Sequence, residues 1–121
     1  MTKYEVKEKL SEYYKASQEV DCLKKRLERL LSINTPDNEV KDRIEEVNNL
    51  YKNAVLKADF ALATTLEMIN KLNNADGDAD VLRKYHIEGL SEKSIAKQMS
   101  LSVDYIRTKR WRSYQKISAL K

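Results

Sequence analysis

Apolar and small side chains in the first quarter of the chain recur in alternating steps of four and three residues. The series consists of Val6, Leu10, Tyr13, Ser17, Val20, Leu27 and Leu31, and Lys24 interrupts it. This spacing places the side chains on one face of a helix that packs lengthwise against a second helix. The pattern therefore predicts a long helix over about residues 4 to 31.

A second helix is predicted to begin after the short break at Ser32-Ile33-Asn34. Thr35 is a good N-cap, Pro36 suits the first helical position, and acidic side chains follow in the first turn. Its series consists of Val40, Ile44, Val47, Tyr51, Ala54, Ala58, Ala61, Thr65, Met68 and Leu72. A connection of about five residues favours an antiparallel pair. The last turns of this longer helix should extend beyond the first helix and contact the rest of the chain.

Further apolar side chains flank both series, so the two helices carry more apolar surface than they bury against each other. These side chains are Leu23 and Leu30 on the first helix, and Val55, Leu62 and Ile69 on the second. Residues 54 to 62 (AVLKADFAL) are apolar nearly all round. Either a second copy of the chain or its C-terminal part covers this surface. We favour the second copy, and hence a homodimer formed through residues 1–74.

The segment Asn73-Asn74-Ala75-Asp76-Gly77 is suited to a helix C-cap and turn, and it separates residues 1–74 from residues 78–121. Three shorter helices are predicted in the second part. They cover about 78 to 87, 92 to 99 after the N-cap Ser91, and 103 to 119 after the N-cap Ser102. The predicted fold is all-α: a long antiparallel helical hairpin (coiled coil) followed by a C-terminal three-helix helix-turn-helix module.

Composition narrows the range of chemistry. The 121 residues include one cysteine, Cys22, and one histidine, His86, so an internal disulfide and a Cys- or His-rich metal site are excluded. No nucleophile–base pair or glycine-rich phosphate loop is present, and we therefore expect neither an enzyme nor a cofactor. No apolar run suggests a signal peptide or a membrane span. These features favour a cytoplasmic protein without a membrane partner.

Charge is distributed unevenly along the chain. Residues 1–77 hold 13 Lys and Arg against 14 Asp and Glu, a net charge of −1, whereas residues 78–121 hold 10 against 5, a net charge of +5. The positive potential therefore belongs to the predicted C-terminal module, where it would attract a polyanion such as DNA.

The stretch 90 to 111 (LSEKSIAKQMSLSVDYIRTKRW) contains two short amphipathic runs joined by Ser100-Leu101-Ser102. Ile95, Ala96 and Met99 give the first run one buried edge, Leu101 is predicted to point inward, and Ile106 opens the inner face of the second run. This pattern is typical of a helix-turn-helix, in which the second helix enters the major groove of DNA.

Residues 81–120 resemble region 4 of sigma factors, and more closely the phage-encoded regulators of the ArpU and RinA type. The matched residues are Leu82, Tyr85, Glu88-Gly89-Leu90-Ser91, Ile95-Ala96, Met99, Leu101-Ser102, Ile106, Ile117 and Leu120. Arg110 stands where the sigma-like pattern usually has an apolar residue. The resemblance implies binding to double-stranded DNA and control of transcription initiation, and it leaves contact with RNA polymerase open.

Helical position divides the polar residues of this module into two predicted classes. The residues expected to read base edges are Val103, Asp104, Arg107 and Thr108. Those expected to bind phosphates are Ser91, Lys93, Lys97, Lys109, Arg110, Arg112 and Lys116. Trp111 and Tyr114 are interpreted as core residues of the last helix.

Three functions remain open from the sequence. The first is a dimeric, sequence-specific transcription regulator. The second is a phage DNA-packaging protein similar to a small terminase, which also combines a helix-turn-helix with a coiled coil. The third is a coiled-coil interaction module that binds protein and no DNA.

Overall fold

The computed structural model describes residues 1–73 and 76–120. These residues form five helices and no strand, which confirms the all-α prediction. The helices are α1 (Lys3–Leu31), α2 (Asn38–Asn70), α3 (Asp78–His86), α4 (Glu92–Met99) and α5 (Val103–Ala119). The predicted turn at 73–77 includes Asn74 and Ala75, which lie outside the described residues, as does Lys121.

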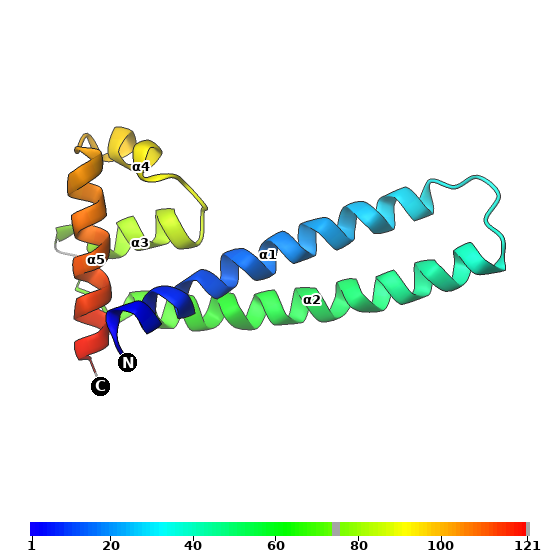
Figure 1. Ribbon diagram of the computed structural model, residues 1–121, viewed down its shortest axis with the longest axis horizontal. Coiled ribbons are helices and arrows are strands. Elements are labelled where there is room, and N and C mark those ends of the chain that lie inside the picture. Colours follow the sequence, from blue (N-terminus) through cyan, green and yellow to red (C-terminus); the bar gives the residue numbers. More distant parts are fainter. Residues whose placement is uncertain (74–75, 121) are drawn as a thin grey trace.

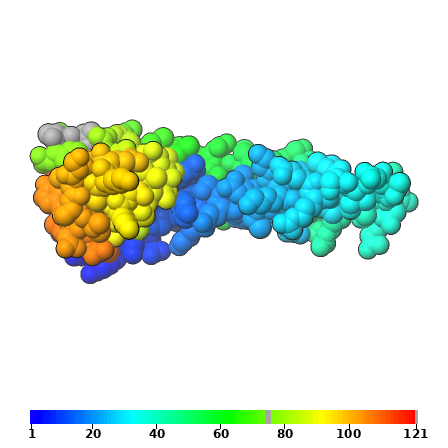
Figure 2. Space-filling model, turned by 90° about the horizontal axis from the view of Figure 1, so that it is seen from above, coloured from blue at the N-terminus to red at the C-terminus, as the bar shows by residue number. Residues whose placement is uncertain are grey.

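The two long helices lie side by side and run in opposite directions, forming a rod (Figure 1). We call α1 and α2 the helical pair, and α3, α4 and α5 the C-terminal trio. The trio packs at the end of the rod where α1 begins and α2 ends, and the connection between α1 and α2 lies at the far end (Figures 1 and 2). The molecule is therefore elongated, with its compact part at one end.

Side-chain caps fix where the long helices begin. The Thr2 hydroxyl accepts from the backbone N–H of Glu5, and the Glu5 carboxylate accepts from the backbone N–H of Thr2, at 3.2 and 3.3 Å. Helix α2 begins at Asn38, where the Asp37 carboxylate accepts from the N–H of Val40 at 2.9 Å. The start predicted at Thr35 and Pro36 is therefore wrong by two residues, because Asp37 supplies the cap.

The apolar series of α2 is largely buried, as the spacing predicts. Its buried members are Val47, Ala54, Ala58, Ala61, Thr65 and Met68, with Leu72 just beyond the helix. In α1, by contrast, Leu23 is buried and Leu31 is 61% exposed, so the predicted end of that series is wrong. Toward the end of α1 the packed side chains are Ala16, Leu23 and Leu30, which follow a strict seven-residue spacing one position before Lys24 and Leu31.

One hydrophobic core joins the helical pair to the C-terminal trio. Its buried members are Val6, Leu10, Met68, Ile69, Leu72, Ala79, Leu82, Tyr114 and Ile117, and Trp111 packs against them. The end of α2 therefore contacts the C-terminal part of the chain, as its predicted length required. Trp111 and Tyr114 are core residues, also as predicted.

Burial rules out two of the residues predicted for dimerisation. Ile69 is fully buried between the helical pair and the trio, and Leu23 is buried within the helical pair. Neither side chain is available to a second copy. Leu30, Val55 and Leu62 remain half-buried.

Candidate nucleic-acid interface

Helices α4 and α5 meet through a three-residue turn with a cap at each helix start. Ser91 accepts from the N–H of Ser94, and Ser102 accepts from the N–H of Tyr105, both at 3.1 Å. Between the helices Ser100 takes a left-handed conformation with φ of 57°, which closes α4 tightly. Leu101 is 37% exposed, so the prediction that it points inward is wrong. The predicted starts of both helices agree with the structure.

A second, smaller core holds α3, α4 and α5 together. Val81, Ile95, Ala96 and Ile106 are its buried members, and Met99 and Val103 pack against it from the turn. Because Val103 packs inward, its side chain has little freedom to reach a base edge. The core fixes the rotation of α5 and thereby decides which of its residues face outward.

The outward face of α5 carries a stripe of polar residues. Asp104, Thr108, Arg112 and Gln115 are exposed and follow one another at helical spacing, opposite the buried Ile106, Arg110, Ser113 and Ile117. Tyr105 is also exposed beside this stripe. We call these five exposed residues the α5 outer face. Two of the four predicted base-reading residues, Asp104 and Thr108, belong to it.

A buried carboxylate engages three of the cations expected to bind phosphate. Asp78, at the start of α3, is fully buried, with Lys109 Nζ at 3.0 Å, Lys116 Nζ at 2.7 Å and Arg112 at 3.4 Å from its oxygens. Burial by itself would raise the pKa of Asp78, but the hydrogen bonds from Lys116 and Lys109 outweigh it and lower that pKa. The cluster ties the side of α5 to the first turn of α3.

Burial within this cluster argues against phosphate binding by Lys109. Its side chain is almost fully buried, and its ammonium also donates to the backbone oxygen of Asp76. Reaching a phosphate would require it to leave both partners and expose the Asp78 charge. Arg112 and Lys116 are about half-exposed, so they can reach outward while Lys109 keeps the carboxylate paired.

Arg110 is the second cation that the structure places inside the molecule. Its guanidinium stacks on the Tyr85 ring at 4.3 Å, donates to the Tyr114 hydroxyl at 3.2 Å, and pairs with Glu92 at 3.3 Å. Burial would lower its pKa, but the Tyr114 hydrogen bond and nearby charges raise it. The residue occupies the inward position that an apolar side chain usually fills, and it joins α3, α4 and α5. We therefore remove Arg110 and Lys109 from the phosphate-binding set.

Arg107 lies at the edge of the α5 outer face rather than on it. Its guanidinium is exposed but pairs with Glu92 at 3.3 Å and with Asp104 at 3.7 Å. To reach a guanine, Arg107 would have to break these two ion pairs. Glu92 would then remain paired with Arg110.

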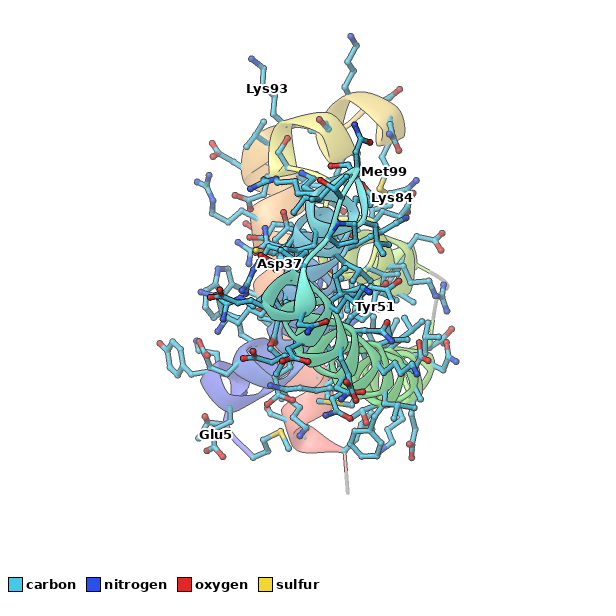
Figure 3. All side chains as sticks on the ribbon, turned by 90° about the vertical axis from the view of Figure 1, so that its right-hand side faces the viewer. Glu5, Asp37, Tyr51, Lys84, Lys93 and Met99 are labelled. Carbon is cyan, nitrogen blue, oxygen red and sulfur yellow. The ribbon has the colours of Figure 1, made fainter. Side chains whose placement is uncertain are left out.

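Helix α4 supplies two cations that have no acidic partner among the described residues, Lys93 in its first turn and Lys97 in its last turn. Lys93 and Lys97 are exposed, and neither forms an ion pair with any residue that the structure describes. Figure 3 shows Lys93 pointing away from the body of the molecule. The first turns of α4 and α5 lie at the same end of the trio (Figure 1). Ser91 is exposed there as the N-cap of α4.

Two residues of the α5 outer face, Tyr105 and Gln115, were missed by reasoning from the sequence. Stepping outward from Ile106 at helical spacing would have found Gln115, because positions 104, 108 and 115 lie on the face opposite Ile106. The partners Asp78 and Glu92 had no such signal. Their proximity to α5 depends on how α3 and α4 pack.

Comparison of the chain with protein-family models, curated proteins and solved structures found no match. Among the residues described, no three His, Cys, Asp or Glu side chains come together as metal ligands. None of the described helices combines the length and apolar character needed to cross a membrane.

Proposed function

We propose that the chain is a sequence-specific double-stranded DNA-binding protein that regulates transcription, with α4 and α5 acting as a helix-turn-helix. The observation that carries the proposal is the α5 outer face, a polar stripe at the end of the trio where α4 presents Lys93 and Lys97 without acidic partners. The resemblance of residues 81–120 to sigma region 4 supports the same function. Contact with RNA polymerase is an additional part of this proposal and rests on the resemblance alone.

In the proposed complex, α5 enters the major groove with its first turns directed at the bases. Asp104 accepts a hydrogen bond from a cytosine amino group, and Thr108 forms a hydrogen bond with a purine or a pyrimidine. Arg107 reaches guanine once its ion pair with Glu92 is broken. Gln115 and Arg112 lie farther along the same face. Lys93 and Lys97 on α4 neutralise the flanking phosphates, and Lys116 and Ser91 contribute there.

The phosphate contacts lead to a prediction about salt. Replacing both Lys93 and Lys97 with Gln should reduce the slope of log K against log salt concentration by about two, because each phosphate contact releases about one counterion. The loss of affinity should be similar for cognate and scrambled duplexes. Fluorescence anisotropy at four or five salt concentrations measures the slope.

The matched control replaces Lys24 and Lys25, two exposed lysines of α1, with Gln. It removes the same charge from the rod, away from the trio, and should leave the slope nearly unchanged. Equal slopes for the two double variants would show that α4 does not contact phosphate.

We further propose that the protein binds DNA as a dimer formed through the outer face of α2. Leu56 and Phe60 are 67% and 73% exposed, and they lie within the segment 54 to 62 that is apolar nearly all round. Large apolar side chains exposed together in this way are typical of an interaction surface. They replace Leu23 and Ile69 as the main contacts.

Charge favours a second copy as the occupant of this face. In an antiparallel pairing of two α2 helices that cross between Asp59 and Phe60, Leu56 of each copy meets Ala63 of the other. The same register brings Lys52 next to Glu67, so opposite charges close both ends of the contact. The pairing is self-complementary, as a two-fold dimer requires.

Phe60→Glu should therefore convert a dimer into a monomer at micromolar concentration, because it places an unpaired charge at the centre of the contact. Light scattering measures the mass. Leu31→Glu is the control: Leu31 is exposed to a similar degree but lies at the far end of α1. A wild-type monomer, or a Phe60→Glu variant that stays dimeric, contradicts the proposed face.

Oligomeric state also separates the rival functions. A discrete dimer supports the regulator, whereas a ring of eight to twelve copies supports a small-terminase-like packaging protein. Absence of any salt-dependent DNA binding supports a protein-interaction module.

A further inference from the structure

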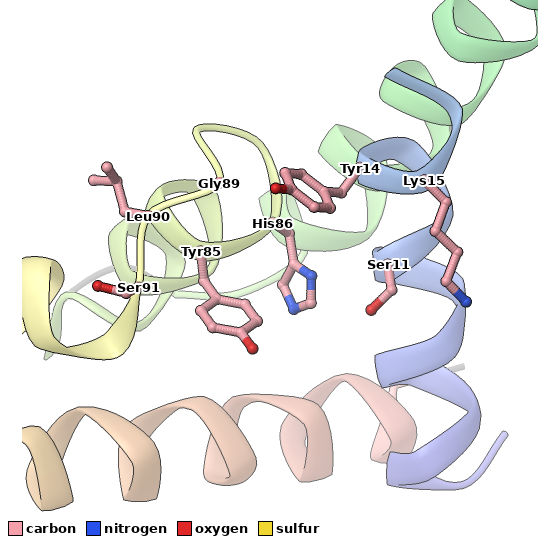
Figure 4. A pocket seen from close by; sticks show the side chains of 8 residues that line it. All are labelled: Ser11, Tyr14, Lys15, Tyr85, His86, Gly89, Leu90 and Ser91. Atoms are coloured by element: carbon pink, nitrogen blue, oxygen red, sulfur yellow. The ribbon is translucent and has the colours of Figure 1, made fainter. Parts of the chain in front are cut away.

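A cavity of about 410 Å³ lies where α1 meets the connection between α3 and α4 (Figure 4). Ser11, Tyr14 and Lys15 line it from α1, Tyr85 and His86 from α3, and Gly89 to Ser91 from the connection. Its volume falls within the range of about 300–1,000 Å³ that is usual for small-molecule sites. No residue of the candidate nucleic-acid interface except Ser91 takes part in it.

Aromatic rings form much of its wall. Figure 4 shows the Tyr14 ring from α1 and the Tyr85 ring from α3, with the His86 ring between Tyr85 and Ser11. The Tyr85 ring is held by the Arg110 guanidinium, which stacks on it at 4.3 Å. A ring supported in this way is a pre-formed surface against which a flat apolar molecule can pack.

Gly89 shapes the opening next to Tyr14. It adopts φ of +72°, and a Cβ there would lie 2.9 Å from Cε2 of Tyr14. The absence of a side chain allows the Tyr14 ring to lie against the backbone of the connection. The aromatic wall from α1 thus reaches across to the segment that leads into α4.

The side chains that line the cavity carry positive charge only. Lys15 is the one residue of the eight with a full charge at neutral pH, since burial, with Arg110 and Lys7 nearby, lowers the pKa of His86 to about 4. Figure 4 shows the Lys15 ammonium directed away from the aromatic rings. Because this side chain is largely exposed and its ion pair with Glu8 is long, at 3.8 Å, the ammonium can turn toward a ligand. The hydroxyls of Ser11 and Ser91 add polar groups. An anionic group on a flat apolar body matches this lining.

We propose that this cavity binds a small planar aromatic carboxylate, with the ring against Tyr14 and Tyr85 and the carboxylate paired with Lys15. Such a ligand bridges α1 and the connection before α4, and so it links the helical pair to the orientation of α4. The inference does not depend on DNA binding.

Naphthalene-2-carboxylate is a suitable probe, with uncharged naphthalene-2-methanol as its matched control. The full chain should bind the carboxylate with one-to-one stoichiometry by calorimetry. In ¹H–¹⁵N spectra the shifted amides should cluster at Ser11, Tyr14, Gly89 and Leu90. The alcohol should bind about fivefold more weakly, as an exposed ion pair worth up to about 1 kcal/mol implies.

Two variants locate the contacts. Lys15→Gln should bind the two probes equally, whereas Lys57→Gln, which removes an exposed lysine of α2, should keep the fivefold difference.

Tyr14→Ala should weaken the binding of both probes at least tenfold. Because Tyr14 is 43% exposed, its loss should leave the fold intact by circular dichroism. Absence of binding, shifted amides elsewhere, or a charge preference that persists in Lys15→Gln would each overturn the proposal.

Discussion

Replacing Asp78 with Asn should lower the free energy of unfolding by about 3–5 kcal/mol, because it leaves the buried Lys109 ammonium without its counter-charge. Lys109 and Asp78 are both inaccessible, at 3.0 Å from each other, and they join α5 to the start of α3. The Asn amide can still accept a hydrogen bond but cannot neutralise three cations. Urea denaturation at pH 7 measures the change.

Asp80→Asn provides the control within the same helix turn. Its carboxylate is exposed and lies 3.1 Å from Arg83, so its replacement should cost less than about 1 kcal/mol. Asp78 and Asp80 both lie near the N-terminus of α3, where an acidic side chain is favourable. The difference between the two losses of stability therefore reports the effect of burial. Equal losses in the two variants would show that the Asp78 cluster contributes no more than a surface ion pair.

Acidification from pH 7 to pH 4 should also destabilise the protein, through His86. Arg110 donates to the Tyr114 hydroxyl, so Tyr114 gives its own hydrogen to His86 Nε2, 2.5 Å away, and the imidazole must be neutral to accept it. Burial, with Arg110 and Lys7 nearby, lowers the pKa of His86 to about 4 from its ordinary 6.5.

The sign of the effect follows from proton uptake. Between pH 6.5 and pH 4 the unfolded chain holds a proton on His86 that the folded chain does not, so stability falls as pH falls through this window. At about 1.36 kcal/mol per pH unit, the loss amounts to about 3 kcal/mol. The lowered pKa of Asp78 acts in a separate window, below the ordinary value of 3.8, where its protonation removes further stability.

His86→Gln isolates this contribution, since its amide can accept from Tyr114 but does not titrate. Urea denaturation at half-unit steps from pH 7 to pH 4.5 should give a steeper dependence of stability on pH for the wild type than for the variant. Parallel curves would mean that His86 is protonated equally in the folded and unfolded chains.

Local sequence signals predicted the helices and most of the packing. Steps of four and three located the buried face of α2, and Ser91 and Ser102 located the starts of α4 and α5, because capping and helical periodicity depend on neighbours in the sequence. The same signals failed where two residues could cap one helix, Thr35 and Asp37, and at the end of α1, where Leu31 lies one position beyond the packed line of Ala16, Leu23 and Leu30.

The candidate site was predicted less completely, because its electrostatics depend on contacts between distant segments. A basic run from Arg107 to Lys116 indicates positive potential, but nothing local shows that Asp78, some thirty residues earlier, occupies the centre of it. Arg110 illustrates the same limit. The sequence places Arg110 four residues after Ile106 and so on the inward face of the helix. Its contacts with Tyr85, Tyr114 and Glu92 could be found only from the way α3, α4 and α5 pack.

The proposed function is tested most directly by selecting bound sequences from a random pool of double-stranded DNA with the full chain. The α5 outer face and a two-fold dimer predict enrichment of one motif, arranged as an inverted repeat with half-sites separated by about one or more helical turns. In the enriched motif, Arg107→Ala should relax the preference at a single base position in each half-site. A pool that shows no enrichment, with binding that does not weaken as salt rises, would contradict DNA recognition by this protein.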